Sequence, residues 1–302
     1  MKQIFAALCT AAIMVQPAWA ATFEDMFPQY VADMDAETQA MVAGMDFQQG
    51  EIDLGNGLAT VSVPQGYYFL APKDARRVLE QFWGNPADPD VLGMLFPVDI
   101  TPLHSGGWGL TYHFDAIGYV SDVDAEGYDY AELLTEMQRD TLADNDWRQS
   151  QGYDSIELVG WAEPPRYDAA ERVLYWAKEL SFSDSDFNTL NFNIRRLGRK
   201  GVLVQNFVAT MDSLPEVKQD LAAVIAMTRY QDGNRYVDFD PDLDKVAAVG
   251  IGGLIAGKVL AKSGFLAVAL LMLKKFWFVL FVPLIWLKGL LFGRRGSGGD
   301  SA

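Results

Sequence analysis

The chain has 302 residues, half of them hydrophobic and 13% aromatic, so it can form a buried core and is not disordered as a whole. Its formal net charge is −16, which repels a phosphate backbone and excludes nucleic acid as a predicted partner. The one cysteine is Cys9, so we expect neither disulfides nor cysteine-ligated zinc in the rest of the chain.

The first twenty residues have the pattern of a secretory signal. Lys2 precedes an apolar run over residues 4–15, and Ala18 and Ala20 supply the small residues of a cleavage site. We therefore predict a signal peptide over residues 1–20. The alternative is an uncleaved anchor, but the apolar run is short for a membrane span.

The pattern of residues 21–45 predicts an acidic helical segment that leads into the domain (the helical lead-in), and residues 46–245 are predicted to form an exported domain. A β-hairpin is indicated over 52–63, where the turn Gly55-Asn56-Gly57 joins two apolar runs. Residues 73–82 predict a helix and 108–120 a strand. Asp129, with Glu132 three residues later, is typical of a helix start, and the expected buried stripe is Leu133, Leu134 and Met137.

Four β-type runs follow one another at residues 156–162, 172–182, 189–196 and 202–211. An amphipathic helix is predicted over 214–230. Consecutive strands with short connections favour antiparallel pairing, so the predicted class is α+β, mainly an antiparallel sheet with packed helices.

The C-terminal part predicts a transmembrane helix. No acidic residue occurs between 246 and 292, and residues 276–292 form a helix of roughly 25 Å, near the short limit for a span. Lys288 lies close enough to its end to reach the interface, and Arg294 and Arg295 are typical of a cytoplasmic flank. Residues 246–275 then form a Gly/Ala/Lys-rich juxtamembrane segment and 293–302 a short basic, then polar tail. A two-helix hairpin is the alternative.

These ends predict a protein of the bacterial inner membrane, with the lipid bilayer as a partner and the bulk of the chain on the periplasmic side.

One motif in the C-terminal part is misleading. Residues 252–258 fit the spacing G-x-x-x-x-G-K of a phosphate-binding loop. Val259 stands where that loop needs Ser or Thr, and the segment has the pattern of a continuous apolar helix, so we reject the match.

Several motifs together resemble a known family. They are Trp83-Gly84-Asn85, Leu92-Gly93-Met94, Gly118-Tyr119-Val120, Gly160-Trp161-Ala162, Leu174-Tyr175-Trp176-Ala177, Leu190-Asn191-Phe192, Leu197-Gly198-Arg199 and Tyr236-x-Asp238-Phe239 leading to Asp244-Lys245. In combination they resemble the domain-of-unknown-function family 2167, described as bacterial predicted membrane-anchored proteins. The resemblance covers roughly residues 45–290. It implies an exported, membrane-tethered domain and carries no catalytic assignment.

A cluster of cations stands out in the acidic domain, formed by Arg195, Arg196, Arg199 and Lys200. On a strand over 189–196, Asn191, Asn193 and Arg195 share one face, and Arg199 follows at the turn. These four residues, Asn191, Asn193, Arg195 and Arg199, are the predicted ligand-binding residues, suited to gripping a carboxylate or phosphate. The alternative is that the arginines pair with neighbouring acidic side chains.

Alternating acids over 238–244 are weak calcium candidates: Asp238, Asp240, Asp242 and Asp244. A calcium-binding EF loop needs Gly at its sixth position and Glu at its twelfth, where this chain has Leu243 and Val249. A solvated acidic loop is therefore the favoured interpretation, and the sequence predicts no cofactor.

The two histidines, His104 and His113, would need a carboxylate from the fold to bind a metal ion. Histidines packed on the sheet or exposed at its surface are the favoured interpretation. No Gly-x-Ser-x-Gly motif marks a nucleophile.

The leading hypothesis is a membrane-anchored envelope protein of unknown biochemical role, whose outer domain binds an envelope protein or a small anionic ligand. The alternative is a hydrolase or transferase acting on an anionic envelope substrate, with Arg195 and Arg199 as a clamp and an unidentified carboxylate as base.

Overall fold

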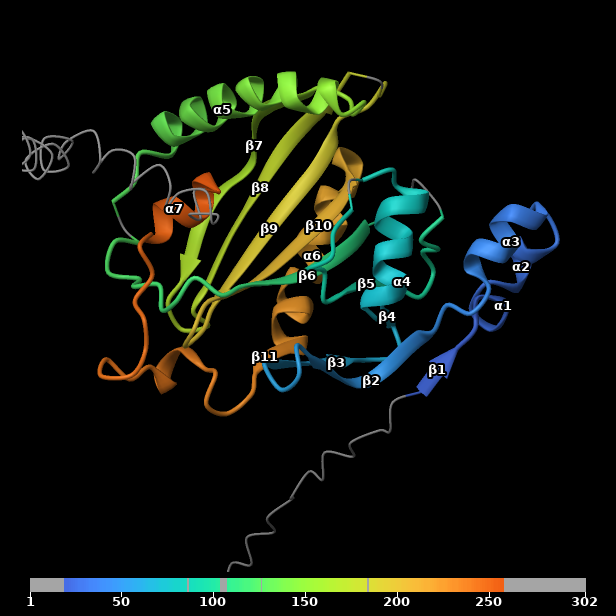
Figure 1. The fold of residues 1–302 in the computed structure, drawn as a ribbon, viewed down its shortest axis with the longest axis horizontal. Coiled ribbons are helices and arrows are strands. Elements are labelled where there is room, and N and C mark those ends of the chain that lie inside the picture. Colours follow the sequence, from blue (N-terminus) through green and yellow to red (C-terminus); the bar gives the residue numbers. More distant parts are fainter. Residues whose placement is uncertain (1–18, 86, 104–107, 126, 184, 258–302) are drawn as a thin grey trace, which may run out of the picture. The chain divides into compact units, whose positions relative to one another are not determined.

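The computed structural model describes residues 19–85, 87–103, 108–125, 127–183 and 185–257. Within this part of the chain, eleven strands form an antiparallel sheet in the order β11-β3-β2-β4-β5-β6-β10-β9-β8-β7, with β1 paired to β2 (Figure 1). The strands are β1 (Trp19–Ala21), β2 (Phe47–Leu54), β3 (Ala59–Val63), β4 (Tyr67–Leu70), β5 (Gly93–Pro97), β6 (Trp108–Asp115), β7 (Ile156–Asp168), β8 (Val173–Phe182), β9 (Thr189–Leu197), β10 (Val202–Thr210) and β11 (Thr228–Tyr230). The predicted α+β class with a mainly antiparallel sheet is confirmed.

Helices cover parts of both sheet faces. They are α1 (Phe23–Met26), α2 (Pro28–Val31), α3 (Ala36–Val42), α4 (Pro72–Arg77), α5 (Tyr130–Ser150), α6 (Leu214–Met227) and α7 (Ile251–Ala256), with the π-helical turn η1 (Val78–Phe82) and the 3₁₀ turns η2 (Met211–Ser213) and η3 (Tyr236–Asp238). Three short helices, α1 to α3, thus replace the single helical segment expected over 21–45.

The predicted end of the signal peptide, after Ala20, falls inside β1, where Trp19 pairs with Gln49 and Ala20 with Gln48.

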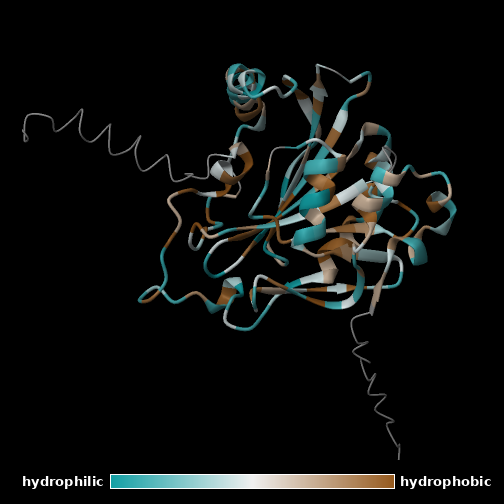
Figure 2. Cartoon of the chain, turned by 45° about the vertical axis from the view of Figure 1, so that its right-hand side comes forward, coloured by the Kyte–Doolittle hydropathy of each residue, from teal (hydrophilic) through white to brown (hydrophobic). Residues whose placement is uncertain are grey.

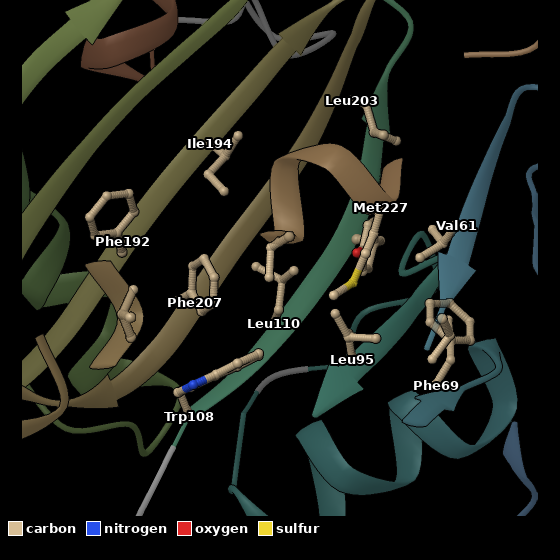
Figure 3. Close-up of a cluster of buried hydrophobic side chains, with 14 of the residues drawn as sticks. Val61, Phe69, Leu95, Trp108, Leu110, Phe192, Ile194, Leu203, Phe207 and Met227 are labelled. Carbon is tan, nitrogen blue, oxygen red and sulfur yellow. The ribbon is translucent and has the colours of Figure 1, made fainter. Parts of the chain in front are cut away.

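The larger core lies between the sheet and α6. Strand alternation sends Leu110, Phe192 and Phe207 to this side, where Val217 and Val224 of α6 meet them (Figure 3). The Phe207 ring makes an edge contact with Trp108 at 4.8 Å between ring centroids. We call this side of the sheet the α6 face. A second core packs α1, α3, α4 and η1 against the opposite side of β2, β4 and β5.

Several predicted elements end at other residues in the structure, and the strand predicted over 156–162 continues to Asp168 as β7. The helix predicted over 214–230 stops at Met227, because Thr228 takes extended backbone angles and starts β11, which pairs with β3. The strand predicted over 108–120 stops at Asp115. The hairpin turn is confirmed, with Asn56 and both flanking glycines at positive φ.

Helix α5 lies along β7 at an edge of the sheet and is mostly polar (Figure 2). Of its predicted stripe, Met137 is buried and Leu133 and Leu134 are half-buried. Polar side chains hold β7 instead: Gln138 donates to the carbonyls of Leu158 and Val159, at 3.1 and 3.2 Å. β7 itself is irregular, with three register shifts against β8 between Leu158 and Arg166.

The described chain ends just after α7. Gly250 and Gly252 let α7 pack closely. A Cβ atom on Gly250 would lie 2.1 Å from the Asp124 side chain, and one on Gly252 would lie 2.1 Å from the Tyr128 ring. In the part of the chain that the structure describes, no helix has the length and apolar character of a membrane span. The predicted span over 276–292 lies outside the described residues, as do residues 1–18 of the predicted leader and His104.

Candidate functional site

The predicted face of β9 exists, and it is the side of the sheet opposite the α6 face. Asn193 donates to Asn191 at 2.9 Å, and Arg195 Nη2 donates to Asn193 Oδ1 at 3.3 Å. Leu190, Phe192 and Ile194 point to the α6 face, as the alternation predicts. The structure therefore brings Asn191, Asn193 and Arg195 together.

Neighbouring strands add residues that the sequence prediction missed. Asn206 of β10 pairs with Asn193, and Trp176 and Lys178 of β8 pair with Asn193 and Asn191. We call the group formed by these residues the polar face: Lys178, Asn191, Asn193, Arg195 and Asn206, with Trp176 beneath Arg195. The signal in the sequence is the alternation over 174–180, which places Leu174, Trp176, Lys178 and Leu180 on one side.

Arg195 is held in place by neutral groups. Its Nη1 donates to Asn206 Oδ1 at 2.9 Å and to the Ile194 carbonyl at 3.0 Å. Its guanidinium carbon lies 5.0 Å from the centroid of the Trp176 ring, a cation–π arrangement. Burial lowers the pKa of Arg195 to about 10, although the charge of Asp115 partly opposes this, and the group stays protonated at neutral pH.

Lys178 is the second cation of the polar face. Burial, and after it the positive charge of Arg195, lower the pKa of Lys178 to about 8. The side chain lines an open pocket of about 410 Å³ between α5 and the sheet, together with Leu180, Ile156, Thr141, Asp144, Trp147 and Arg148. Among the described residues, neither Lys178 nor Arg195 forms an ion pair with a carboxylate.

The other cations of the predicted cluster have different surroundings. Arg199 Nε donates to Asp244 Oδ2 at 2.6 Å, so this arginine does not join Asn191, Asn193 and Arg195. Arg196 points to the α6 face, where its Nη2 donates to the Ile225 carbonyl at 2.7 Å. The structure thus gives Arg195 and Arg199 separate hydrogen-bond partners, Asn206 and Asp244.

The acidic loop over 238–244 is held by arginines. Asp238 forms two hydrogen bonds with the Arg235 guanidinium, at 2.9 Å each, and these lower the pKa of Asp238 to about 2. Asp244 accepts a hydrogen bond from Arg199, and Asp240 Oδ1 accepts one from the backbone nitrogen of Asp242. Within the described residues, no group of three or more acidic, histidine or cysteine side chains is arranged to hold a metal ion. His113 contacts one carboxylate, with Nε2 at 2.7 Å from Asp88 Oδ2.

A half-buried hub of hydrogen bonds at Asp122 was not predicted. Its carboxylate accepts from Tyr167 at 2.7 Å, from Tyr236 at 3.0 Å and from Arg172. Burial alone would raise the pKa of Asp122, but these hydrogen bonds and the Arg172 charge bring it below its usual 3.8. The Arg172 guanidinium also lies 4.9 Å from the centroid of the Tyr236 ring. The hub joins β7, the β7–β8 turn and η3.

Comparison with known proteins gives little for function and one clear result for family. No curated protein matches the chain. The chain is similar to the solution structure of cyanobacterial PsbP (CyanoP) from Synechocystis sp. PCC 6803, at 12% identity and a TM-score of 0.35, over 60% of this chain and 91% of that one. The model of a family of proteins of unknown function, DUF2167, matches residues 46–285. The expected resemblance is thereby confirmed, and the chain belongs to the DUF2167 family.

Proposed function

We propose that this protein is a membrane-tethered envelope protein whose outer domain binds a small anionic ligand on the polar face. The sequence of the two ends supports the tether, through the signal pattern over 1–20 and the apolar run over 276–292. The polar face supports the ligand class, since carboxylates, sulfate and phosphate all accept hydrogen bonds from guanidinium and ammonium groups.

One observation carries the proposal: in a chain of net charge −16, two partly buried cations share a face, and among the described residues neither forms an ion pair with a carboxylate, although the charge of Asp115 acts on Arg195 from beyond ion-pair distance. Placing a cation in such a site without an ion-pair partner costs free energy. The lowered pKa of Lys178 reports that cost. An anion bound between Lys178 and Arg195 would remove it, so the site gains more from an anion than a surface lysine or arginine does.

The supporting groups also fit a ligand. Asn191, Asn193 and Asn206 present amide groups around Arg195. The buried Trp176 Nε1 has no hydrogen-bond partner in the described structure, so one donor stays unused beside the guanidinium. We infer binding rather than catalysis, because the guanidinium, ammonium and amide groups of the polar face are hydrogen-bond donors suited to holding an anion.

Sulfate is a suitable probe because its charge is constant across neutral pH. The full-length protein, purified in detergent, should gain thermal stability and give a saturable calorimetric titration with sulfate. Arg195→Gln and Lys178→Gln should each weaken binding at least about tenfold, the size expected when a charged hydrogen bond is removed.

Arg229→Gln is the matched control, because Arg229 is an exposed arginine paired with Glu51 at 2.9 Å and lies away from the polar face. It should bind sulfate as the natural chain does. Equal sulfate affinity in all three variants, or no saturable binding of sulfate, acetate or phosphate by the natural chain, would refute the proposed ligand site.

A further inference from the structure

Four exposed apolar side chains gather in the loops at one end of the sheet. Val123, Val237, Leu243 and Val246 are 91, 76, 78 and 55% exposed. We call these four residues the apolar rim. Scattered exposed apolar residues are normal on a soluble surface, but a group of them in one place marks a contact with another phase or molecule.

Hydrogen bonds and ring contacts show that the apolar rim belongs to one connected group of loops. Tyr236 donates to Asp122, which places Val237 and Val123 on segments that touch. The Tyr119 ring stacks on Tyr236 at 4.5 Å and on Phe239 at 3.9 Å between ring centroids. Tyr119 also forms an isolated bridge with Val246.

The rim is held rigidly. Arg199 and the backbone nitrogen of Asp240 both donate to Asp244, next to Leu243. The backbone nitrogens of Gly233 and Arg235 donate to Asp238, next to Val237. Polar and aromatic neighbours thus fix the backbone, while the four apolar side chains stay outside the core. Their exposure follows from a defined conformation and not from a frayed loop.

The position of the rim along the chain points to its partner. The segment over 231–250 runs from β11 to α7, and the described residues end at Gly257, directly after α7 (Figure 1). Gly250 and Gly252 pack on Asp124 and Tyr128, in the same loop as Val123. The described part of the chain therefore ends next to this group of loops. Beyond it stand residues 258–292, which contain no acidic residue.

We infer that the apolar rim rests on the surface of the lipid bilayer and fixes which end of the domain faces the membrane. The inference rests on the tether in the proposed function but is independent of the anion site. Segment 231–250 carries Asp232, Asp238, Asp240, Asp242 and Asp244 against Arg235 and Lys245, a balance of −3. This excess repels anionic headgroups, so the expected surface is zwitterionic lipid.

Site-specific labelling tests this directly. In a Cys9→Ser background, single cysteines at Val237 and Leu243 carry an environment-sensitive fluorophore in the full-length chain, reconstituted into phosphatidylcholine vesicles. Both labels should shift to shorter emission wavelength on reconstitution and be quenched severalfold by lipids with spin labels in their upper acyl chain.

Phe187→Cys is the matched control. Phe187 is 57% exposed and precedes β9, whereas the rim lies beyond the other end of β9, roughly 30 Å away for a strand of this length. Its label should show neither the shift nor the quenching. In vesicles containing phosphatidylglycerol, quenching at positions 237 and 243 should decrease.

Each failure has a distinct meaning. Equal quenching at 187 and 243 in protein that floats with the vesicles would overturn the apolar rim as a bilayer contact and leave the tether standing. Protein that does not float with the vesicles would overturn both the tether and the rim. Neither result changes the sulfate titration of the polar face.

Discussion

Lys178 and Arg195 show how a sheet face can hold positive charge without acidic partners. Their long side chains start from adjacent strands, and burial acts against the charged state of each. The positive charge of Arg195 lowers the pKa of Lys178 further, whereas the charge of Asp115 favours the protonated form of Arg195. Arg195 offsets part of the effect of burial by stacking on Trp176, an option that the Lys178 amine does not have here. Lys178 is therefore the group whose charge responds to pH near neutrality.

Sulfate affinity should fall as the pH rises through about 8, the pKa of Lys178. Below that value Lys178 is protonated and contributes its charge to the site, and above it the neutral amine contributes only a weak donor. In Lys178→Gln this step should be absent, while Arg195 keeps a residual affinity up to about pH 10. Calorimetric titration from pH 6 to 9 measures the effect, and an unchanged pH profile in the variant would contradict it.

Residue types along β9 predicted part of this site, and physical reasons limit the rest. The period of two correctly placed Asn191, Asn193 and Arg195 on one side. Lys178 and Asn206 could not be added, because strand pairing and register decide which side chains of β8 and β10 lie beside Arg195. Arg199, also predicted for this group, donates to Asp244 instead, and the sequence does not show that this distant carboxylate folds back onto it.

At the scale of elements, strong local patterns were reliable and short segments were not. The strands over 156–211 follow long alternating or apolar runs, and all four were predicted. β4 and β5 were missed because four or five apolar residues do not distinguish a strand from a helix turn. The local sequence favoured a helix that continues through residue 230. In the structure residues 228–230 instead form β11, because they pair with the edge of β3, and this pairing cannot be seen in the local sequence.

Asp122 links elements that are far apart in the sequence, and its loss should loosen all of them. Asp122→Ala leaves Tyr167, Tyr236 and Arg172 without this acceptor, so we expect the free energy of unfolding to fall by about 2 kcal/mol. Urea unfolding at pH 7 measures this. Asp242→Ala, an exposed carboxylate in the acidic loop, should change stability by less than about 0.5 kcal/mol.

The Asp122 contribution also has a defined pH dependence. The folded-state pKa lies below the usual 3.8, so the contribution is present in full above that value and is lost as the pH falls through the folded pKa. The stability difference between Asp122→Ala and the natural chain should therefore shrink below about pH 4. A difference that stays constant down to pH 2 would show that the hub acts through packing and not through the charge of Asp122.

For the whole molecule, the predicted topology places the domain and the tail on opposite sides of the membrane. Phe187→Cys, exposed at a turn of the domain, should react with a membrane-impermeant maleimide in intact spheroplasts. Ser297→Cys, beyond the predicted span, should react only after permeabilisation. Labelling of both in intact spheroplasts would favour the two-helix hairpin, and labelling of neither would contradict export.

The irregular outer strand of the sheet has a consequence for self-association. A strand at the end of an antiparallel sheet offers unpaired backbone groups on which another chain can add a strand. In β7, Asn145 from α5 bonds both backbone groups of Ile156, Gln138 occupies the next carbonyls, and the bulges and Pro164-Pro165 interrupt the remaining ladder. Growth of the sheet into a polymer is therefore blocked at this border, and a second copy cannot dock there by strand addition without first displacing α5.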